Sequence, residues 1–179
     1  MVRPAGRNSP LVAGELSGYL ARLNSIAALA KLSGGKVGGY SLLEHTADVG
    51  ISAYGDSLED ALSCLAAGMF SLLVDPNSVA LGHAQVVSLA SRDRETLAVD
   101  WLNELLYQYE ATGFLMKECR IELNPGKAGA ASFTLEAHCR GERFDAGKHH
   151  ILGVIKAATY HQLSVTQDSL WRINVILDV

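Results

Sequence analysis

The sequence lacks the features that would place the protein in a membrane or in an oxidising compartment. No apolar run approaches the ~20 residues that a membrane-spanning helix requires, although 49% of the 179 residues are apolar. The cysteines, Cys64, Cys119 and Cys139, are odd in number and have no CxxC pattern, which argues against a disulfide framework and a thiolate zinc site. We therefore expect a soluble, cytoplasmic protein with no membrane partner, whose thiols are reduced and mostly buried.

Positive charge is scarce outside the N-terminal segment. The whole chain has a net charge of −4, residues 1–39 contribute +4, and residues 40–179 therefore carry −8. An acidic body of this kind repels phosphate backbones and attracts cations or basic partners. The charge distribution argues against direct binding of nucleic acid by residues 40–179.

Residues 1–39 form a basic extension that we expect to be disordered or partly helical. Apolar residues between Gly14 and Gly35 recur at helical spacing, and the glycines at 34, 35, 38 and 39 would end such a helix. The basic character resembles a targeting presequence, but a long apolar region and a clear cleavage signal are missing. A lineage-specific tail and an upstream start codon are the alternative interpretations.

Two amphipathic helices are predicted after Tyr40. Apolar residues recur at i, i+3, i+4 and i+7 between Leu58 and Leu73, following an N-cap signal at Ser57. A second apolar stripe extends from about Asp93 to Tyr109. Each helix has one apolar face, so each is expected to pack against another element.

Most of the remaining sequence predicts strands. Apolar and polar residues alternate in CRIEL (119–123), in SFTLEAHC (132–139) and in the closing LWRINVILDV, with a turn at 124–129 and another beginning at Gly141. Residues 153–165 fit either a short helix or a strand that ends at Val165, and Lys148, His149 and His150 fit a solvated loop. Residues 40–179 are therefore predicted to form a single α+β domain, a largely antiparallel or mixed β-sheet with the two helices packed on one face.

His45 and Asp48 lie three residues apart in the segment HTAD. Residues at this spacing point to opposite faces of a strand but can act together in a turn, so we expect a loop here. The structural alternative is an aspartate that orients the imidazole ring or caps the turn.

A second group of acids lies at the end of the sequence. Asp178 precedes Val179, whose free α-carboxylate would lie beside it, and two such negative groups repel unless a cation lies near them. If the first strand begins beside the end of the last strand, Asp48 joins them. These oxygens would suit Ca²⁺ or Mg²⁺ better than Zn²⁺, although frayed terminal carboxylates are the structural alternative.

Four segments together resemble a known family. EHTADVGISAYGDSLEDAL, DWLNELLY, IKAATYHQLSV and WRINVILDV occur in the order and spacing of the archease family, across residues 40–179. The resemblance implies a non-catalytic protein that binds a divalent ion, Ca²⁺ in known cases, with Mg²⁺ or Mn²⁺ as alternatives. It further implies activation of an RtcB-type RNA ligase in tRNA splicing and RNA repair, by promoting the ligase's guanylylation and multiple turnover, with RNA contacted only through the ligase.

The resemblance also implies roles for particular residues. The metal ligands of the family match Asp48, Asp178 and Val179, and the residues matched to ligase activation are Lys156, His45 and His161. Three alternatives remain open. The protein could be a stand-alone, divalent-metal-dependent phosphohydrolase with His45 as base, the ion could only tether the C-terminus of a binding module, or Lys156 could merely pair with an aspartate.

Overall fold

The computed structural model describes residues 37–44, 48–125 and 133–179, so the predictions for residues 1–36 and for His45 lie outside the described residues. Its elements, in chain order, are β1 (Gly38–Glu44), β2 (Val49–Gly55), α2 (Leu58–Leu73), the short 3₁₀ helix η1 (Pro76–Ser78), β3 (His83–Ser91), α3 (Arg94–Thr112), β4 (Phe114–Pro125), β5 (Phe133–Arg143), β6 (Ala157–Gln167) and β7 (Trp171–Asp178). No helix in these ranges is both long enough and apolar enough to cross a membrane.

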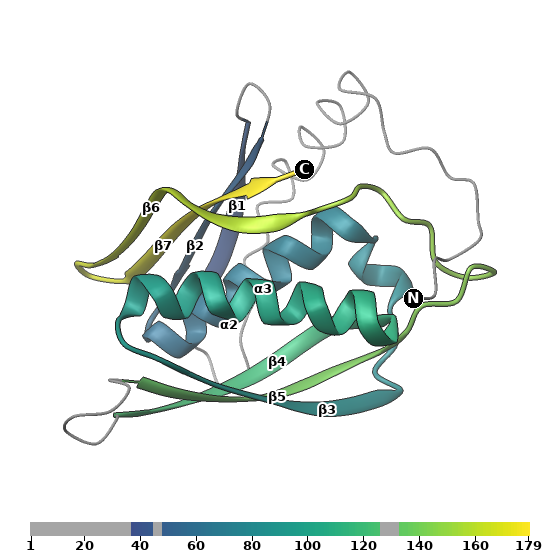
Figure 1. The fold of residues 1–179 in the computed structure, drawn as a ribbon, viewed down its shortest axis with the longest axis horizontal. Helices are drawn as coiled ribbons and strands as arrows, with labels where there is room; N and C mark the ends of the chain where they lie inside the picture. The colour runs from purple at the N-terminus through teal and green to yellow at the C-terminus, as the bar shows by residue number, and fades with distance from the viewer. Residues whose placement is uncertain (1–36, 45–47, 126–132) are drawn as a thin grey trace.

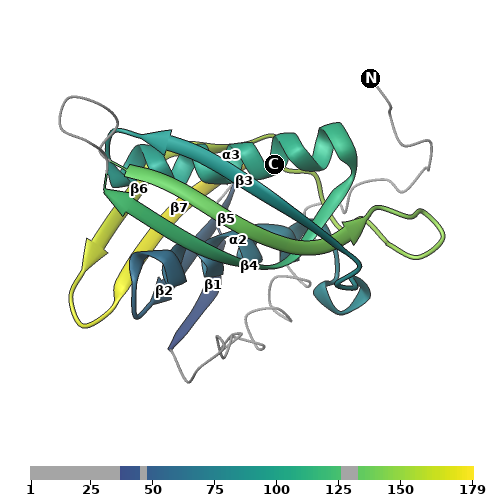
Figure 2. The same ribbon diagram turned by 90° about the horizontal axis from the view of Figure 1, so that it is seen from below.

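The α+β class is confirmed, but the strands form two sheets where one was expected. One sheet has the order β1-β2-β7-β6 and the other β3-β5-β4, and every pairing is antiparallel. Both helices lie between the sheets (Figure 1), and the view from below shows β3, β5 and β4 covering them (Figure 2). Each sheet thus buries one face against the helices, which is the packing that the predicted amphipathic pattern requires.

Helix α2 lies at the centre of this arrangement. Ser57 caps it as predicted: its Oγ accepts a hydrogen bond from the Asp60 N–H at 3.1 Å and donates one to the Asp60 carboxylate at 2.8 Å. The helix contacts β1, β2 and β7 on one side and β4 on the other. Because both sides of the helix are covered, burial includes nearly all of its residues and is not confined to a single stripe.

Helix α3 keeps the one-sided burial that its sequence predicts. Asp93 is its N-cap and accepts a hydrogen bond from the Thr96 N–H at 2.7 Å, and Gly113 ends the helix in the left-handed conformation at φ 72°. On the inner face Trp101 is fully buried, and its indole N–H donates to the Leu62 carbonyl of α2 at 3.2 Å. This bond joins the two helices within the core.

The predicted turn at Gly141 is wrong, because Gly141 lies inside β5. It pairs with Met116 of β4 on one side and His83 of β3 on the other. A Cβ atom at this position would lie 1.9 Å from the carbonyl oxygen of Leu115. Glycine is required here by the close approach of two backbones beside the irregularity in β4, between Met116 and Glu118.

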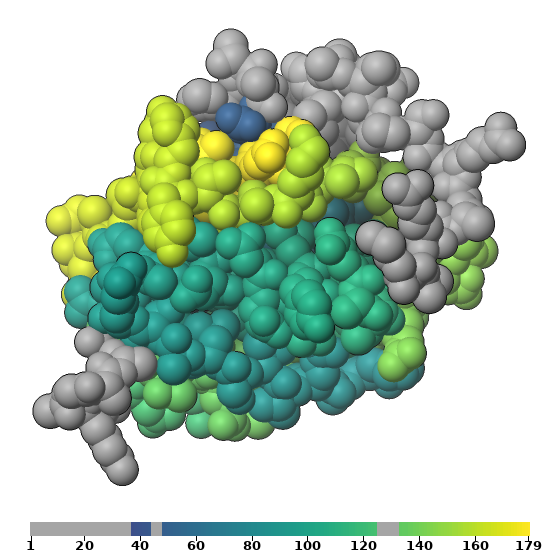
Figure 3. Space-filling model, viewed as in Figure 1, coloured from purple at the N-terminus to yellow at the C-terminus, as the bar shows by residue number. Residues whose placement is uncertain are grey.

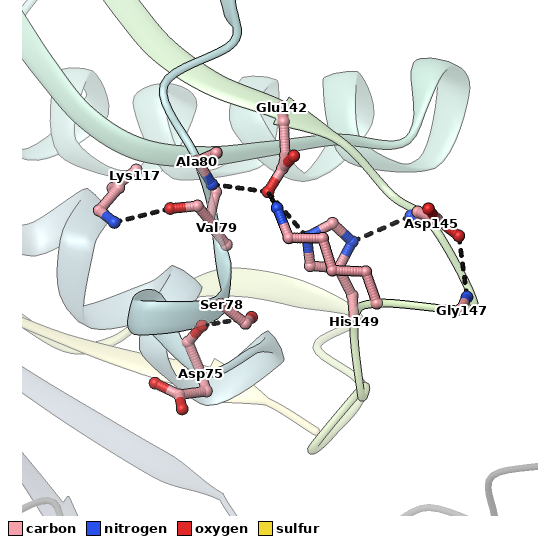
Figure 4. A network of polar contacts seen from close by, with 10 residues as sticks. Asp75, Ser78, Val79, Ala80, Lys117, Glu142, Asp145, Gly147 and His149 are labelled. Carbon is pink, nitrogen blue, oxygen red and sulfur yellow. Dashed lines mark hydrogen bonds and ion pairs between the residues drawn. The ribbon is translucent and has the colours of Figure 1, made fainter.

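The predicted solvated loop at Lys148–His150 is also wrong at its centre. His149 is only 3% exposed, and Figure 4 shows its ring between Glu142 and Asp145. Its Nδ1 accepts a hydrogen bond from the Asp145 N–H at 2.9 Å, which leaves Nε2 to donate to Glu142 Oε1 at 3.0 Å. Burial is tolerated because both ring nitrogens have partners.

Glu142 connects this loop to the segment that follows η1. Its carboxylate accepts hydrogen bonds from Lys148 Nζ at 2.5 Å and from the Ala80 N–H at 2.6 Å, in addition to the contact with His149 (Figure 4). The hydrogen bond from Lys148 is the largest cause that lowers the pKa of Glu142 to about 2, followed by that from Ala80. The ionised carboxylate therefore holds three chain segments together.

Candidate functional site

Strand pairing brings the two ends of the domain together at Asp178. In the β2–β7 ladder Val49 pairs with Leu177, and in the β6–β7 ladder Ala157 pairs with Asp178. Asp48 immediately precedes β2, so one further step of the same antiparallel register lies opposite Asp178. The chain segments that carry Asp48, Asp178 and Lys156 are thus neighbours at one end of the four-stranded sheet.

Lys156 places a positive charge beside Asp178 and Val179. Its backbone N–H donates a hydrogen bond to the Asp178 carbonyl at 2.8 Å, which fixes the start of β6 against the end of β7. Its Nζ donates to the main-chain oxygen of Val179 at 2.8 Å and lies 3.5 Å from Asp178 Oδ1. The Lys156 and Asp178 side chains are 61% and 51% exposed, so water screens this ion pair.

The surface position of this group is visible from the side of α3. Figure 3 shows β6 on the surface above α3, with the yellow end of β7 beside it. Asp178 and Lys156 are exposed, while Asp48 and Val179 are partly buried. A partner macromolecule could therefore reach the charged groups without any rearrangement of the core.

Asn103 of α3 holds the start of β6 in place. Its side-chain Nδ2 donates to the Ala158 carbonyl at 3.2 Å, and its Oδ1 accepts from the Ala158 N–H at 2.9 Å. Among the described strands β6 lies at the edge of its sheet, so Asn103 bonds these two groups on the side away from β7. The position of Asn103 in DWLNELLY, beside the buried stripe, indicates a polar side chain near the core but does not identify Ala158 as its partner.

Of the two histidines matched to the site, the structure describes His161. His161 is exposed and lies five residues along β6 from Lys156, about 16 Å in an extended strand. It falls in the irregular part of β6, between Thr159 and Ser164, where Gln162 has a positive φ of 50°. His45 lies outside the described residues.

The oxygen atoms at this sheet end are the donors that could hold a metal ion. Within the described ranges, no three His, Cys, Asp or Glu side chains form a group that could bind one. Asp48 and Asp178 are two such side chains, and the third donor predicted at the site is an oxygen of Val179. An all-oxygen set is suited to a hard cation such as Ca²⁺ or Mg²⁺.

Comparisons with known proteins agree with the fold. The alignments with two relatives and with one solved structure each cover 78% of this chain. Protein archease of Methanosarcina barkeri is 35% identical over 141 residues, and that of Methanosarcina acetivorans is 36% identical over 142 residues, each aligned over 95% of the relative. The solution structure of Methanobacterium thermoautotrophicum protein 1598 superimposes with a TM-score of 0.65 at 28% identity, over 98% of that chain.

Comparison of the sequence with protein-family models agrees with these alignments. The model of the Archease protein family (MTH1598/TM1083) matches residues 40–179, which are the residues that carry both sheets, both helices and the charged sheet end. The match covers well over half of the chain. The chain therefore belongs to the archease family.

Proposed function

We propose that this chain is a metal-binding accessory protein that activates an RtcB-type RNA ligase in tRNA splicing and RNA repair, without being an enzyme itself. The observation that supports this most is the contact of Lys156 with Val179 and Asp178 at an exposed sheet end. These residues belong to the segments by which the sequence resembles archease proteins. We place the activity in the cytoplasm, where free thiols such as the three cysteines persist.

The proposed cation is held by Asp48, Asp178 and Val179. Their oxygens match the preference of Ca²⁺, our first choice, and of Mg²⁺ or Mn²⁺ as alternatives. A bound divalent ion would supply positive charge between acidic groups that Lys156 neutralises only in part. Ca²⁺ takes six to eight oxygen ligands, so solvent or partner oxygens would complete its shell.

Lys156 is the residue through which we propose that the ligase is activated. Its ion pair with Asp178 is exposed, and such pairs contribute only about 0–1 kcal/mol. The ammonium group can therefore leave Asp178 at little cost and contact phosphate groups in the nucleotide site of the ligase, promoting guanylylation and multiple turnover. We propose that His45 and His161 contribute further contacts with the ligase.

The charge of the domain favours a protein partner over RNA. Residues 40–179 carry a net charge of −8, since the whole chain has −4 and the first 39 residues +4. Such a surface repels a phosphate backbone and attracts a basic protein surface. RNA would accordingly be contacted only through the ligase.

The decisive experiment is multiple-turnover RNA ligation by the cognate ligase, with and without this protein. We expect wild type to stimulate turnover, and Asp48→Ala, Lys156→Ala and a chain lacking residues 178–179 to lose most of the stimulation. Asp168→Ala is the matched control, because Asp168 lies in the turn at the opposite end of the β6–β7 hairpin. Equal stimulation by wild type and all three variants would refute the proposal.

Phosphate-ester hydrolysis and thermal unfolding, measured on the same variants, separate the alternatives. A stand-alone phosphohydrolase would hydrolyse a phosphate ester without the ligase and lose that activity in Asp48→Ala. An ion that only tethers the C-terminus would leave Asp48→Ala less stable yet fully able to stimulate the ligase. Either result would replace the proposed role of the metal site.

A further inference from the structure

The three cysteines, which are dispersed along the sequence, meet in the folded protein. Cys119 of β4 and Cys139 of β5 are register partners across the two strands. Cys64 of α2 faces the same region, and all three line one cavity of about 730 Å³. This cavity lies at the three-stranded sheet, away from the charged end of the other sheet.

The geometry of the Cys119–Cys139 pair suits a disulfide. Directly opposed residues of an antiparallel ladder have Cα atoms about 4.5–5.5 Å apart. Disulfides span Cα separations of about 4.4–6.8 Å, so the two strands need not move apart or together to accommodate the bond. Cys64, on a helix, has no such register partner.

Burial and hydrogen bonding make the three thiols unequal. Cys119 is partly exposed, whereas Cys64 and Cys139 are buried. Hydrogen bonds from Cys139 and, more weakly, from Ser63 lower the pKa of Cys119. The same hydrogen bond to Cys119, together with burial, raises the pKa of Cys139, and burial raises the pKa of Cys64 to about 12. Of the three thiols, Cys119 is therefore the most exposed and the most readily deprotonated.

We propose that Cys119 is a peroxide-reactive thiol and that Cys139 resolves it, so that a hydroperoxide entering the cavity converts the pair into a disulfide between β4 and β5. The Cys119 thiolate attacks the terminal peroxide oxygen, the O–O bond breaks, and the alkoxide leaves as an alcohol after taking up a proton. Cys119 is thereby oxidised to a sulfenic acid.

The second step forms the cross-strand bond. The sulfur of Cys139 attacks the sulfur of Cys119, the S–O bond breaks, and the hydroxyl leaves as water with the proton of the Cys139 thiol. Two thiols and one hydroperoxide give one disulfide, one alcohol and one water. Small thiols reduce the disulfide back to two thiols by exchange and are themselves oxidised to a disulfide, which makes this position a reversible modification site.

The test is peroxide treatment of the purified, reduced full-length chain in the presence of EDTA. After treatment with tert-butyl hydroperoxide we expect the number of free thiols, counted in denaturant, to fall from three to one. Tryptic mapping without reductant should recover peptide 118–120 joined to peptide 128–140. A bridge that contains Cys64, or three thiols remaining under conditions that oxidise free cysteine, would overturn the proposal.

Matched serine variants assign the two roles. Cys64→Ser should lose both remaining thiols at the wild-type rate, whereas Cys119→Ser should lose its thiols about tenfold more slowly or not at all. Cys139→Ser should accumulate a sulfenic acid at Cys119 that dimedone traps. Oxidation of Cys119→Ser at the wild-type rate would contradict the assignment. Should a variant fail to fold, the wild-type peptide map still decides between the outcomes.

Discussion

The side-chain amide of Asn103 hydrogen-bonds to both the N–H and the carbonyl of Ala158, and in this way α3 takes the place of a further strand along β6. The residue just before β6 is Lys156, whose N–H is bonded to Asp178. An uncharged residue of α3 therefore helps to hold the strand that begins directly after Lys156.

Replacing Asn103 by alanine should both destabilise the protein and weaken ligase stimulation. The change leaves the N–H and the carbonyl of the buried Ala158 without partners, which should lower the free energy of unfolding by about 2 kcal/mol. Urea denaturation measures this loss. Gln108→Ala on the same helix is the control, because its partly buried bond to Glu104 is an i, i+4 pair, whose loss should cost no more than about 0.5 kcal/mol. Similar costs for both variants would contradict this role of Asn103.

Calcium should stabilise the folded protein in proportion to its occupancy of the proposed site. Ligand at 100 times its dissociation constant adds about 2.7 kcal/mol to the free energy of unfolding, so the melting temperature should rise with added Ca²⁺ and fall again with EDTA. Asp48→Ala and Asp178→Ala should abolish this rise, while Asp168→Ala should retain it. An equal rise in all four proteins would place the ion elsewhere.

Lys156→Ala should separate function from stability. Since its pair with Asp178 is exposed, the free energy of unfolding should change by no more than about 1 kcal/mol, while stimulation of the ligase is lost. Thermal unfolding and the ligation assay on the same preparation measure both quantities. A large loss of stability with stimulation retained would show instead that Lys156 only holds the sheet ends together.

Much of the helical structure was predictable because each helix buries an apolar face and begins at a capping residue. Ser57 caps the first helix as predicted, and the second helix begins directly after Asp93, close to its predicted start. The division into two sheets was not predictable, because pairing between strands such as β3 and β5 depends on contacts far apart in the sequence. β3 was missed because, among its nine residues, only Val87 and Ser91 are buried, so no apolar alternation was visible.

The candidate site was likewise predictable only in part. The expected repulsion between the Asp178 and Val179 carboxylates indicated a cation nearby. In the structure the Lys156 ammonium group contacts both residues. The metal-ligand roles of Asp48, Asp178 and Val179 stay predictions, as do the ligase-activating roles of Lys156, His45 and His161. Asn103 and His149 could not have been assigned from sequence, because their partners, Ala158 and Glu142, come from other elements. A polar residue reveals its function only when its hydrogen-bonding partner is known.

Gly141→Ala should be among the most damaging small substitutions in the domain. The new methyl group would lie 1.9 Å from the Leu115 carbonyl oxygen, so β4 and β5 must separate locally and lose ladder hydrogen bonds. We expect a loss of more than about 3 kcal/mol, or insoluble protein. Gly82→Ala is the matched control, because nothing lies within 4 Å of its added Cβ. Comparable melting temperatures for the two variants would contradict the close approach.

The Glu142 network should make stability depend on pH in an acidic window. The pKa of Glu142 is lowered in the folded protein from 4.5 to about 2, mainly by the hydrogen bond from Lys148. The unfolded chain therefore binds a proton more readily, and the contribution of Glu142, fully present above pH 4.5, is lost as the pH falls toward about 2. Melting temperatures measured across this window should fall less steeply for Glu142→Gln than for wild type. Glu110→Gln, at an exposed position on α3, should follow the wild-type slope. If Glu142→Gln also follows it, the ionised carboxylate does not hold the β5–β6 loop against the segment after η1.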